Sequence, residues 1–183
     1  MAGLSVRTLT GLPELHAGDD LAALIAASAE REQPLNDGAL LVIAHKAVSK
    51  AEGAVVMLDE VEAGERALEL AARFSVETGQ TRDARAVQVV LDQSSEVLRA
   101  ERGVLICRTH HGFVCANAGV DASNASAPDT LIVLPRDPDE SARRIRARVR
   151  ELTSAHVGVI ITDSFGRAWR NGQVDVAIGL AGV

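Results

Sequence analysis

The most informative segment of the chain reads Val157-Gly158-Val159-Ile160-Ile161-Thr162, and it continues directly into Asp163-Ser164. A short apolar run rich in β-branched residues predicts a buried strand. Catalytic groups often project from the end of such a strand, because the scaffold behind them is rigid. The segment therefore predicts a central strand that carries Asp163 and Ser164 at its carboxyl end.

The segments on either side predict both strands and helices. Helical periodicity covers residues 20–30, 65–77 and 83–99, and a further helix is expected after the capping pair Asp137-Pro138. Strands and helices interleave without a strict period, so the sequence favours an α+β fold with mixed sheets and packed helices, in one domain over residues 1–183. Further strands are expected at residues 4–10, 39–44, 55–58, 104–108, 113–116 and 130–134, and loops at residues 45–53 and 117–129.

Composition excludes several classes of protein. Aromatic residues make up 2% of the chain and the net charge is −6, so a base-stacking or broadly basic nucleic-acid surface is not expected. No apolar run is long enough to cross a bilayer, and the N-terminus does not resemble a signal peptide. We therefore expect a cytoplasmic protein without nucleic-acid or membrane partners, in which Cys107 and Cys115 are reduced core thiols. The predicted solvated face of one helix carries Arg143, Arg144, Arg146, Arg148 and Arg150.

Two segments offer oxygen ligands for a hard cation. Asp121 and Asn124 lie three residues apart in a loop of small residues, and Asp163 and Ser164 end the buried strand. If the segments converge, these groups could bind Mg²⁺ or Mn²⁺. Each segment also has an ordinary explanation, because Asp-x-x-Asn is common in turns and Asp after a strand often caps a helix.

Lysine and histidine pairs are further candidates. Lys46 and Lys50 could bind phosphates as point charges, or could be a solvated pair. His110 and His111 could act as acid and base, although histidines in a hairpin turn are more often surface residues. The phosphate-binding patterns GxxxxGK[ST] and GxGxxG do not occur in the chain.

Taken together, four segments resemble the coenzyme F420:L-glutamate ligase family, also found as the N-terminal half of a two-domain actinobacterial form. Each segment is weak evidence alone, but they occur in the family's order over essentially the whole chain. The segments are Gly11-Leu12-Pro13-Glu14, Val48-Ser49-Lys50-Ala51-Glu52-Gly53, Ala118-Gly119-Val120-Asp121-Ala122-Ser123-Asn124, and Ile161-Thr162-Asp163-Ser164-Phe165-Gly166-Arg167 with its continuation Trp169-Arg170-Asn171-Gly172-Gln173.

The resemblance implies a γ-glutamyl ligase-like fold, an intertwined homodimer, and a set of site residues. GTP would be held by Leu12, Pro13, Glu14, Leu15, Lys50 and Asn124, with a less secure contact at His45, where relatives carry a small hydroxyl residue. Two divalent ions, Mg²⁺ or Mn²⁺, would be bound by Asp121, Asp163 and Ser164, with K⁺ as a further candidate ion. Asp163 and Lys50 are the expected catalytic residues, and Arg167 and Arg170 are candidates for gripping the acidic substrate.

The implied reaction joins the carboxylate of a coenzyme F420 precursor to the amine of L-glutamate through an acyl phosphate, with release of GDP and phosphate. Relatives continue beyond the segment that matches Val183, so the chain is expected to be incomplete at its C-terminus relative to the family. Two alternatives remain open at this point: a metal-dependent phosphohydrolase, and a truncated domain that only binds nucleotide or dimerises.

Overall fold

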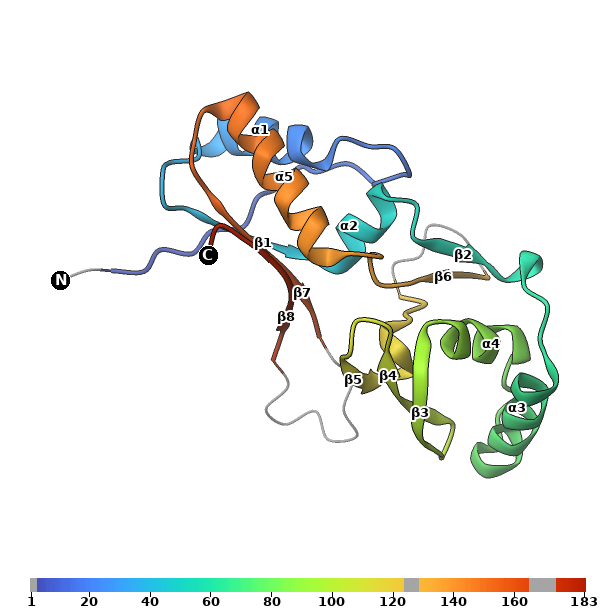
Figure 1. Ribbon diagram of the computed structural model, residues 1–183. Coiled ribbons are helices and arrows are strands. Elements are labelled where there is room, and N and C mark those ends of the chain that lie inside the picture. The colour runs from blue at the N-terminus through green and yellow to red at the C-terminus, as the bar shows by residue number, and fades with distance from the viewer. Residues whose placement is uncertain (1–2, 124–128, 165–173) are drawn as a thin grey trace.

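The computed structural model describes residues 3–123, 129–164 and 174–183, which form two lobes joined by a short antiparallel ribbon (Figure 1). Helices and mixed sheets are both present, so the predicted α+β class is confirmed. The order of elements is α1 (Leu21–Glu32), β1 (Leu40–Ala44), α2 (His45–Ala51), β2 (Val55–Met57), η1 (Leu58–Glu60), α3 (Glu65–Thr78), α4 (Ala84–Asp92), β3 (Ser94–Glu101), β4 (Val104–Thr109), β5 (Val114–Ala116), η2 (Asn117–Gly119), β6 (Thr130–Ile132), α5 (Pro138–Thr153), β7 (Gly158–Asp163) and β8 (Val176–Ala181).

The first lobe is built on a sheet with the strand order β1-β7-β8. Strand β7 pairs in parallel with β1 and antiparallel with β8, so the predicted strand over residues 157–162 is the centre of this sheet. Helices α1 and α5 cover one face (Figure 1). Val159 and Ile161 of β7 are fully buried there, and Leu40, Val42 and Leu180 leave apolar side chains exposed.

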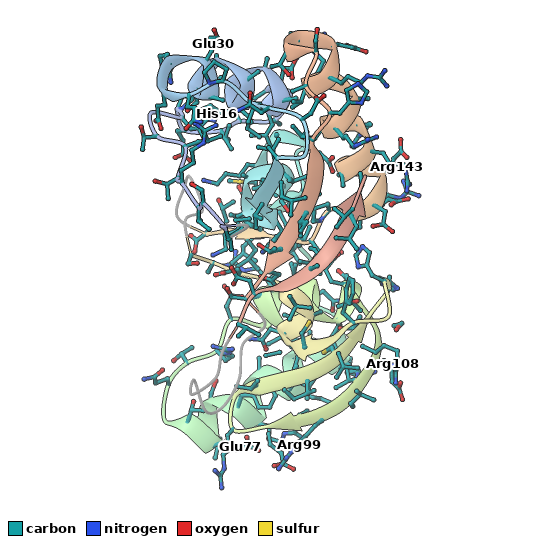
Figure 2. The ribbon with its side chains drawn as sticks, turned by 90° about the vertical axis from the view of Figure 1, so that its left-hand side faces the viewer. His16, Glu30, Glu77, Arg99, Arg108 and Arg143 are labelled. Carbon is teal, nitrogen blue, oxygen red and sulfur yellow. The ribbon has the colours of Figure 1, made fainter. Side chains whose placement is uncertain are left out.

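The second lobe packs α3 and α4 against the antiparallel sheet β3-β4-β5 (Figure 1). Its core contains Phe74, Leu105 and Cys107. Both cysteines are free and buried, as predicted. Figure 2 shows Glu77, Arg99 and Arg108 at the outer edge of this lobe and Arg143 at the outer edge of the first lobe. Between the lobes, β2 pairs with β6, and β6 leads back to the first lobe.

Local capping explains where two helices begin. The Asp20 carboxylate accepts the N–H of Ala23 at the start of α1, and the Asp137 carboxylate accepts the N–H of Glu140 at the start of α5. These bonds satisfy backbone donors that a helix leaves unpaired in its first turn. Pro138 occupies the first position of α5, as the sequence predicted.

Three expectations about secondary structure are wrong. Residues 4–10 form no strand; Leu4 and Val6 are exposed, and Thr10 is hydrogen-bonded to α1 instead. The single helix predicted over residues 83–99 ends at Asp92, because the next residues pair with β4 as strand β3. The polar segment expected to be a loop after β1 is the helix α2, whose residues Val48 and Ser49 are buried.

The arginine-rich face of α5 is exposed, as expected, with one exception. Arg146 is partly buried, and its guanidinium donates to the backbone oxygen of Val157 at 2.8 Å. No helix in the described ranges of the chain is long and apolar enough to span a membrane.

Candidate functional site

Helix α2 brings together the segments that the sequence analysis singled out. It begins immediately after β1 and contacts β1, β6 and β7. Three of its side chains, His45, Lys46 and Lys50, each meet an acidic side chain from a different part of the chain. Helix α2, where the first lobe meets strand β6, is therefore the candidate site.

Lys46 binds the loop that carries Asp121. Its ammonium lies 2.6 Å from Asp121 Oδ2 and donates to Ser123 Oγ at 2.6 Å. Backbone hydrogen bonds in both directions with Ile132 fix Asp121 beside β6, at 3.0 and 2.8 Å. The carboxylate is thus held by the scaffold and neutralised by one lysine.

The environment of Asp121 keeps it ionised. Burial acts to raise the pKa of this carboxyl, but the Lys46 ammonium and the N–H of Ser123 act in the opposite direction and hold its pKa below the ordinary value. The Ser123 N–H donates to Asp121 Oδ1 at 2.6 Å. Both carboxylate oxygens therefore already accept hydrogen bonds or an ion pair.

Asp163, at the carboxyl end of β7, faces His45. The Nε2 atom of His45 lies 3.2 Å from Asp163 Oδ1, and Nδ1 lies 3.3 Å from Ser49 Oγ. The side chain of His45 is 2% exposed and that of Asp163 is 14% exposed. Asp163 is also close enough to Cys115 for its charge to contribute to that thiol's raised pKa, after the larger effect of burial.

Lys50 connects α2 to the loop at residues 12–15. Its ammonium contacts Glu14 Oε1 at 2.5 Å. Leu15 is buried in the core of the first lobe, whereas Leu12, Pro13 and Glu14 are exposed. The N–H of Gly18 donates to the oxygen of Ala51 at 2.9 Å, which fastens the loop to the end of α2. The structure thus places an exposed loop beside a nearly buried ammonium.

Ser164 continues from β7, and its hydroxyl donates to the Asp175 carboxylate. Asp175 precedes β8, which pairs with β7, so this contact closes the end of the sheet. The predicted residues Asn124, Arg167 and Arg170 lie outside the described residues.

The oxygen donors fit a divalent cation in chemical type. Asp121 lies on one side of the N-terminal end of α2, and Asp163, Ser164 and Asp175 lie near the end of β7; carboxylate and hydroxyl oxygens are the ligands that Mg²⁺ and Mn²⁺ prefer. In the part of the chain that is described, no three acidic, histidine or cysteine side chains are grouped closely enough to hold an ion. The ammonium of Lys46 neutralises Asp121 instead.

The histidine pair does not belong to this site. His110 Nε2 donates to the oxygen of Asp92, and His111 Nε2 donates to the oxygen of Pro135, both at 2.9 Å. His111 also stacks on Phe113. These contacts tie the β4-β5 hairpin to its neighbours, which is a structural role.

Sequence reasoning did not assign roles to Ser49, Ser123 or Asp175. The i, i+4 spacing of Lys46 and Lys50 was a usable signal, because it places both ammoniums on one side of a helix. No local pattern links Asp175 to Ser164, since their contact depends on how β8 returns to β7.

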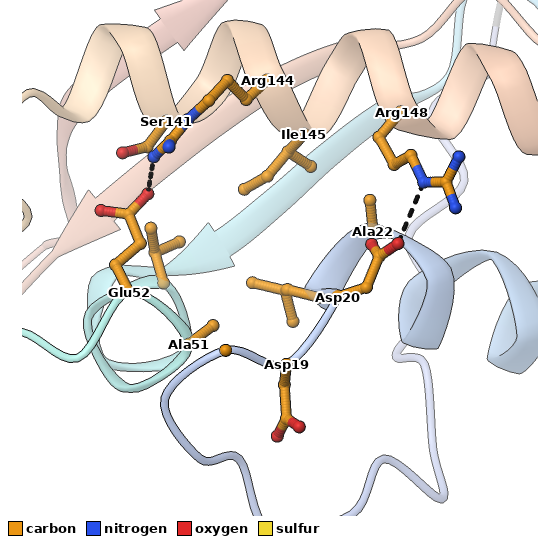
Figure 3. Close-up of a pocket in the computed structure, with 12 residues that line it drawn as sticks. Asp19, Asp20, Ala22, Ala51, Glu52, Ser141, Arg144, Ile145 and Arg148 are labelled. Atoms are coloured by element: carbon orange, nitrogen blue, oxygen red, sulfur yellow. Dashed lines mark hydrogen bonds and ion pairs between the residues drawn. The ribbon is translucent and has the colours of Figure 1, made fainter.

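A cavity of about 570 Å³ lies on the other side of α2 (Figure 3). Val48, Ala51 and Glu52 face it, about half a helical turn from the two lysines. Ion pairs from α5 cross its rim: Arg144 to Glu52, and Arg148 Nε to Asp20 Oδ2 at 2.9 Å. Neither lysine, nor Asp121, nor Asp163 lines this cavity, so it is separate from the site described above.

Comparison with known proteins gives one consistent family. The family model described as F420-0:Gamma-glutamyl ligase matches residues 11–183. The chain is 49% identical over 186 residues to the coenzyme F420:L-glutamate ligase of Methanopyrus kandleri, covering 100% of this chain and 69% of that protein. It is 44% identical to the enzyme of the same name from Methanothermobacter thermautotrophicus, covering 99% of this chain and 69% of that protein. It is also 44% identical to the one from Archaeoglobus fulgidus, with coverage of 98% and 68%.

Proposed function

Because the chain belongs to the F420-0:gamma-glutamyl ligase family, its role is that of a ligase in coenzyme F420 biosynthesis, and we propose that it works by a GTP-dependent reaction at helix α2. The substrates are the carboxylate of an F420 precursor and the amine of L-glutamate. The observation that supports this site is the convergence of Lys46, Lys50, Asp121 and Asp163 on one short helix.

Amide formation requires an activated carboxylate, since a carboxylate at neutral pH is a poor electrophile. In the proposed first step, a carboxylate oxygen of the precursor attacks the γ-phosphorus of GTP. The bond from that phosphorus to the β-γ bridging oxygen breaks, giving an acyl phosphate and GDP. The glutamate nitrogen then attacks the acyl carbon, loses a proton, and expels inorganic phosphate.

The lysines supply positive charge for the phosphates. Lys50 has only 11% of its side chain exposed, so a phosphate oxygen that contacts it meets a poorly screened charge. Its present partner, Glu14, lies on the exposed loop at residues 12–15, which we propose lies along the nucleotide. Lys46 is the second phosphate ligand, and it can turn from Asp121 to the nucleotide when a metal ion replaces it there.

Asp121, Asp163 and Ser164 would hold the divalent ions. A bound Mg²⁺ or Mn²⁺ supplies charge screening between the phosphate oxygens and helps to align the attack. The fixed backbone around Asp121 and the rigid strand behind Asp163 keep these side chains in place before the ions arrive.

The direct test is a product assay with GTP, the F420 precursor, L-glutamate and Mn²⁺. The proposal predicts one GDP and one phosphate for each amide formed, and no phosphate release when the precursor is left out. Asp163→Asn should abolish turnover in a folded chain, whereas the exposed control Asp59→Asn should keep it. Phosphate release that needs neither precursor nor glutamate would identify a phosphohydrolase instead.

We also propose the homodimer that the family resemblance implies. Leu40, Val42 and Leu180 expose apolar side chains on one face of the β1-β7-β8 sheet, and a partner subunit would remove them from water. Light scattering should then give about twice the chain's mass of 19.2 kDa. A mass of one chain at micromolar concentration would contradict this proposal.

A further inference from the structure

His45 has an unusual environment for the first residue after a strand. Its ring is 2% exposed, and it lies between Ser49 on the next turn of α2 and Asp163 at the end of β7. Ser49 is itself fully buried. A buried imidazole needs partners for both of its nitrogens, because a polar atom that loses its water without gaining a partner destabilises the fold.

Only one nitrogen is well satisfied. Nδ1 lies 3.3 Å from Ser49 Oγ. Nε2 lies 3.2 Å from Asp163 Oδ1, but among the described residues it makes no hydrogen bond of good angle. The distance between Nε2 and Oδ1 is short enough for a hydrogen bond, but the angle at the hydrogen is not. A small rotation of the Asp163 carboxylate would correct the angle and complete the bond.

The ring cannot reach a nucleotide from this position without unpacking α2, since almost none of its surface is exposed. Asp163, by contrast, is partly exposed. His45 therefore lies behind Asp163 relative to solvent, and any effect it has on a ligand acts through that carboxylate.

We propose that His45 is a positioning residue: its Nε2–H would hold Asp163 Oδ1 and so orient this carboxylate for binding a divalent cation. This inference rests on the function proposed above. Ligating carboxylates are commonly fixed by hydrogen bonds from a second layer of residues, and the loss of such a bond typically weakens metal binding by roughly 10–100-fold.

For a ring that carries a single proton, the two contacts also favour one tautomer. If Nε2 carries the proton that is donated to Asp163, Nδ1 is an acceptor and the Ser49 hydroxyl must donate to it. Hydrogen bonds then run in one direction, from the Ser49 hydroxyl to His45 Nδ1 and from His45 Nε2–H to Asp163. The opposite tautomer would place two acceptors, Nε2 and a carboxylate oxygen, against each other.

Two substitutions of His45 distinguish the contact made by Nε2 from the contact made by Nδ1. In His45→Gln the side-chain amide reaches about as far as Nε2 and can still donate to Asp163. In His45→Asn it reaches only as far as Nδ1, so it can contact Ser49 and not Asp163. The exposed His156→Asn is the matched control, and thermal unfolding of each variant establishes that it is folded.

Mn²⁺ affinity is measured by calorimetry and electron paramagnetic resonance, without substrate or turnover. We expect His45→Asn to bind Mn²⁺ roughly 10–100-fold more weakly than the parent chain, and His45→Gln and His156→Asn to stay close to it. The ¹⁵N spectrum of the parent should show His45 protonated on Nε2.

Failure of this inference is distinguishable from failure of the proposed function. Three results would each overturn the positioning role while Asp163→Asn still loses the metal: unchanged Mn²⁺ affinity in His45→Asn, equal losses in the Asn and Gln variants, or an Nε2 that carries no proton. If Asp163→Asn binds Mn²⁺ as well as the parent does, the metal site itself is wrong, and the role of His45 falls with it.

Discussion

Lys46 and Lys50 are the only lysines among the 19 basic residues of the chain, and both lie on α2. Arginine serves at every other basic position. A lysine ammonium is a compact point charge on a flexible stem, which suits a phosphate that changes its bonding during a reaction. The chain therefore uses lysine on this helix alone.

Lys50→Ala should weaken GTP binding by about tenfold or more, because a hydrogen bond to a charged group contributes roughly 1.5–3 kcal/mol. Glutamate binding should change much less. Calorimetric titration of GTP in the presence of Mn²⁺ measures the loss, and Arg99→Ala on the outer edge of the second lobe is the control. Equal GTP affinity in Lys50→Ala and the parent would remove Lys50 from the nucleotide site.

The cysteines should be chemically inert in the folded chain. Burial, with smaller contributions from the charges of Asp163 and Cys107, raises the pKa of the Cys115 thiol to about 12. At pH 8 the reactive thiolate is then about one part in ten thousand. Iodoacetamide should label neither cysteine in native conditions and both in guanidinium; rapid native labelling would show that the β4-β5 strands open.

Among the helices and strands, β8 and α5 pack against each other without room for a further side-chain atom at Gly179. A Cβ added at Gly179 would lie 2.4 Å from the backbone oxygen of Pro138, the first residue of α5. Backbone cannot move aside as the tip of a side chain can, so this position admits only glycine.

Gly179→Ala should therefore destabilise the fold by about 1–3 kcal/mol or more through overpacking. Gly3→Ala is the control, because its new Cβ would have no heavy atom within 4 Å. Urea unfolding compares the two variants with the parent. A small effect at Gly179 would mean that α5 shifts easily away from the sheet.

Ion pairs join distant parts of the chain at the scale of the whole molecule. Asp20 at the start of α1 binds Arg148 on α5, and Glu52 after α2 binds Arg144 on the same helix. The helices on one face of the β1-β7-β8 sheet are thereby connected to one another around the cavity in Figure 3.

Asp20 should make stability depend on acidic pH. The N–H of Ala23 and then the Arg148 guanidinium hold the pKa of this carboxyl below its ordinary value of roughly 4. Its contribution is therefore complete above about pH 4 and is lost as pH falls through the lower, folded-state pKa.

Asp20→Asn should cost at most about 1 kcal/mol at pH 7, because the pair is exposed and screened. The difference from the parent in urea unfolding should shrink at pH 3. A difference that stays constant between pH 7 and pH 3 would show that the charge of Asp20 has no part in it.

Local sequence patterns predicted those helices and strands whose burial or capping depends on residues close together in the sequence. The buried strand β7, the cap at Asp137 and the hairpin from β4 to β5 were all predicted correctly. The same reasoning was wrong where one pattern of apolar residues fits both a helix and a strand. Val97 fits a helix that continues from α4, but its pairing with Cys107 of β4 makes it part of strand β3. Pairing energy comes from the partner strand, so no local window contains it.

The sequence by itself determined the α+β class, the central strand and, through motifs distributed along the chain, the family. It also supplied the acidic and basic groups of the candidate site. Only the tertiary structure decided that these groups meet on α2, because Lys46 and Ser123 are 77 residues apart and Lys50 and Glu14 are 36 apart. Secondary structure follows from interactions between near neighbours, whereas a site of this kind depends on how whole elements pack, which sums many weak contacts across both lobes.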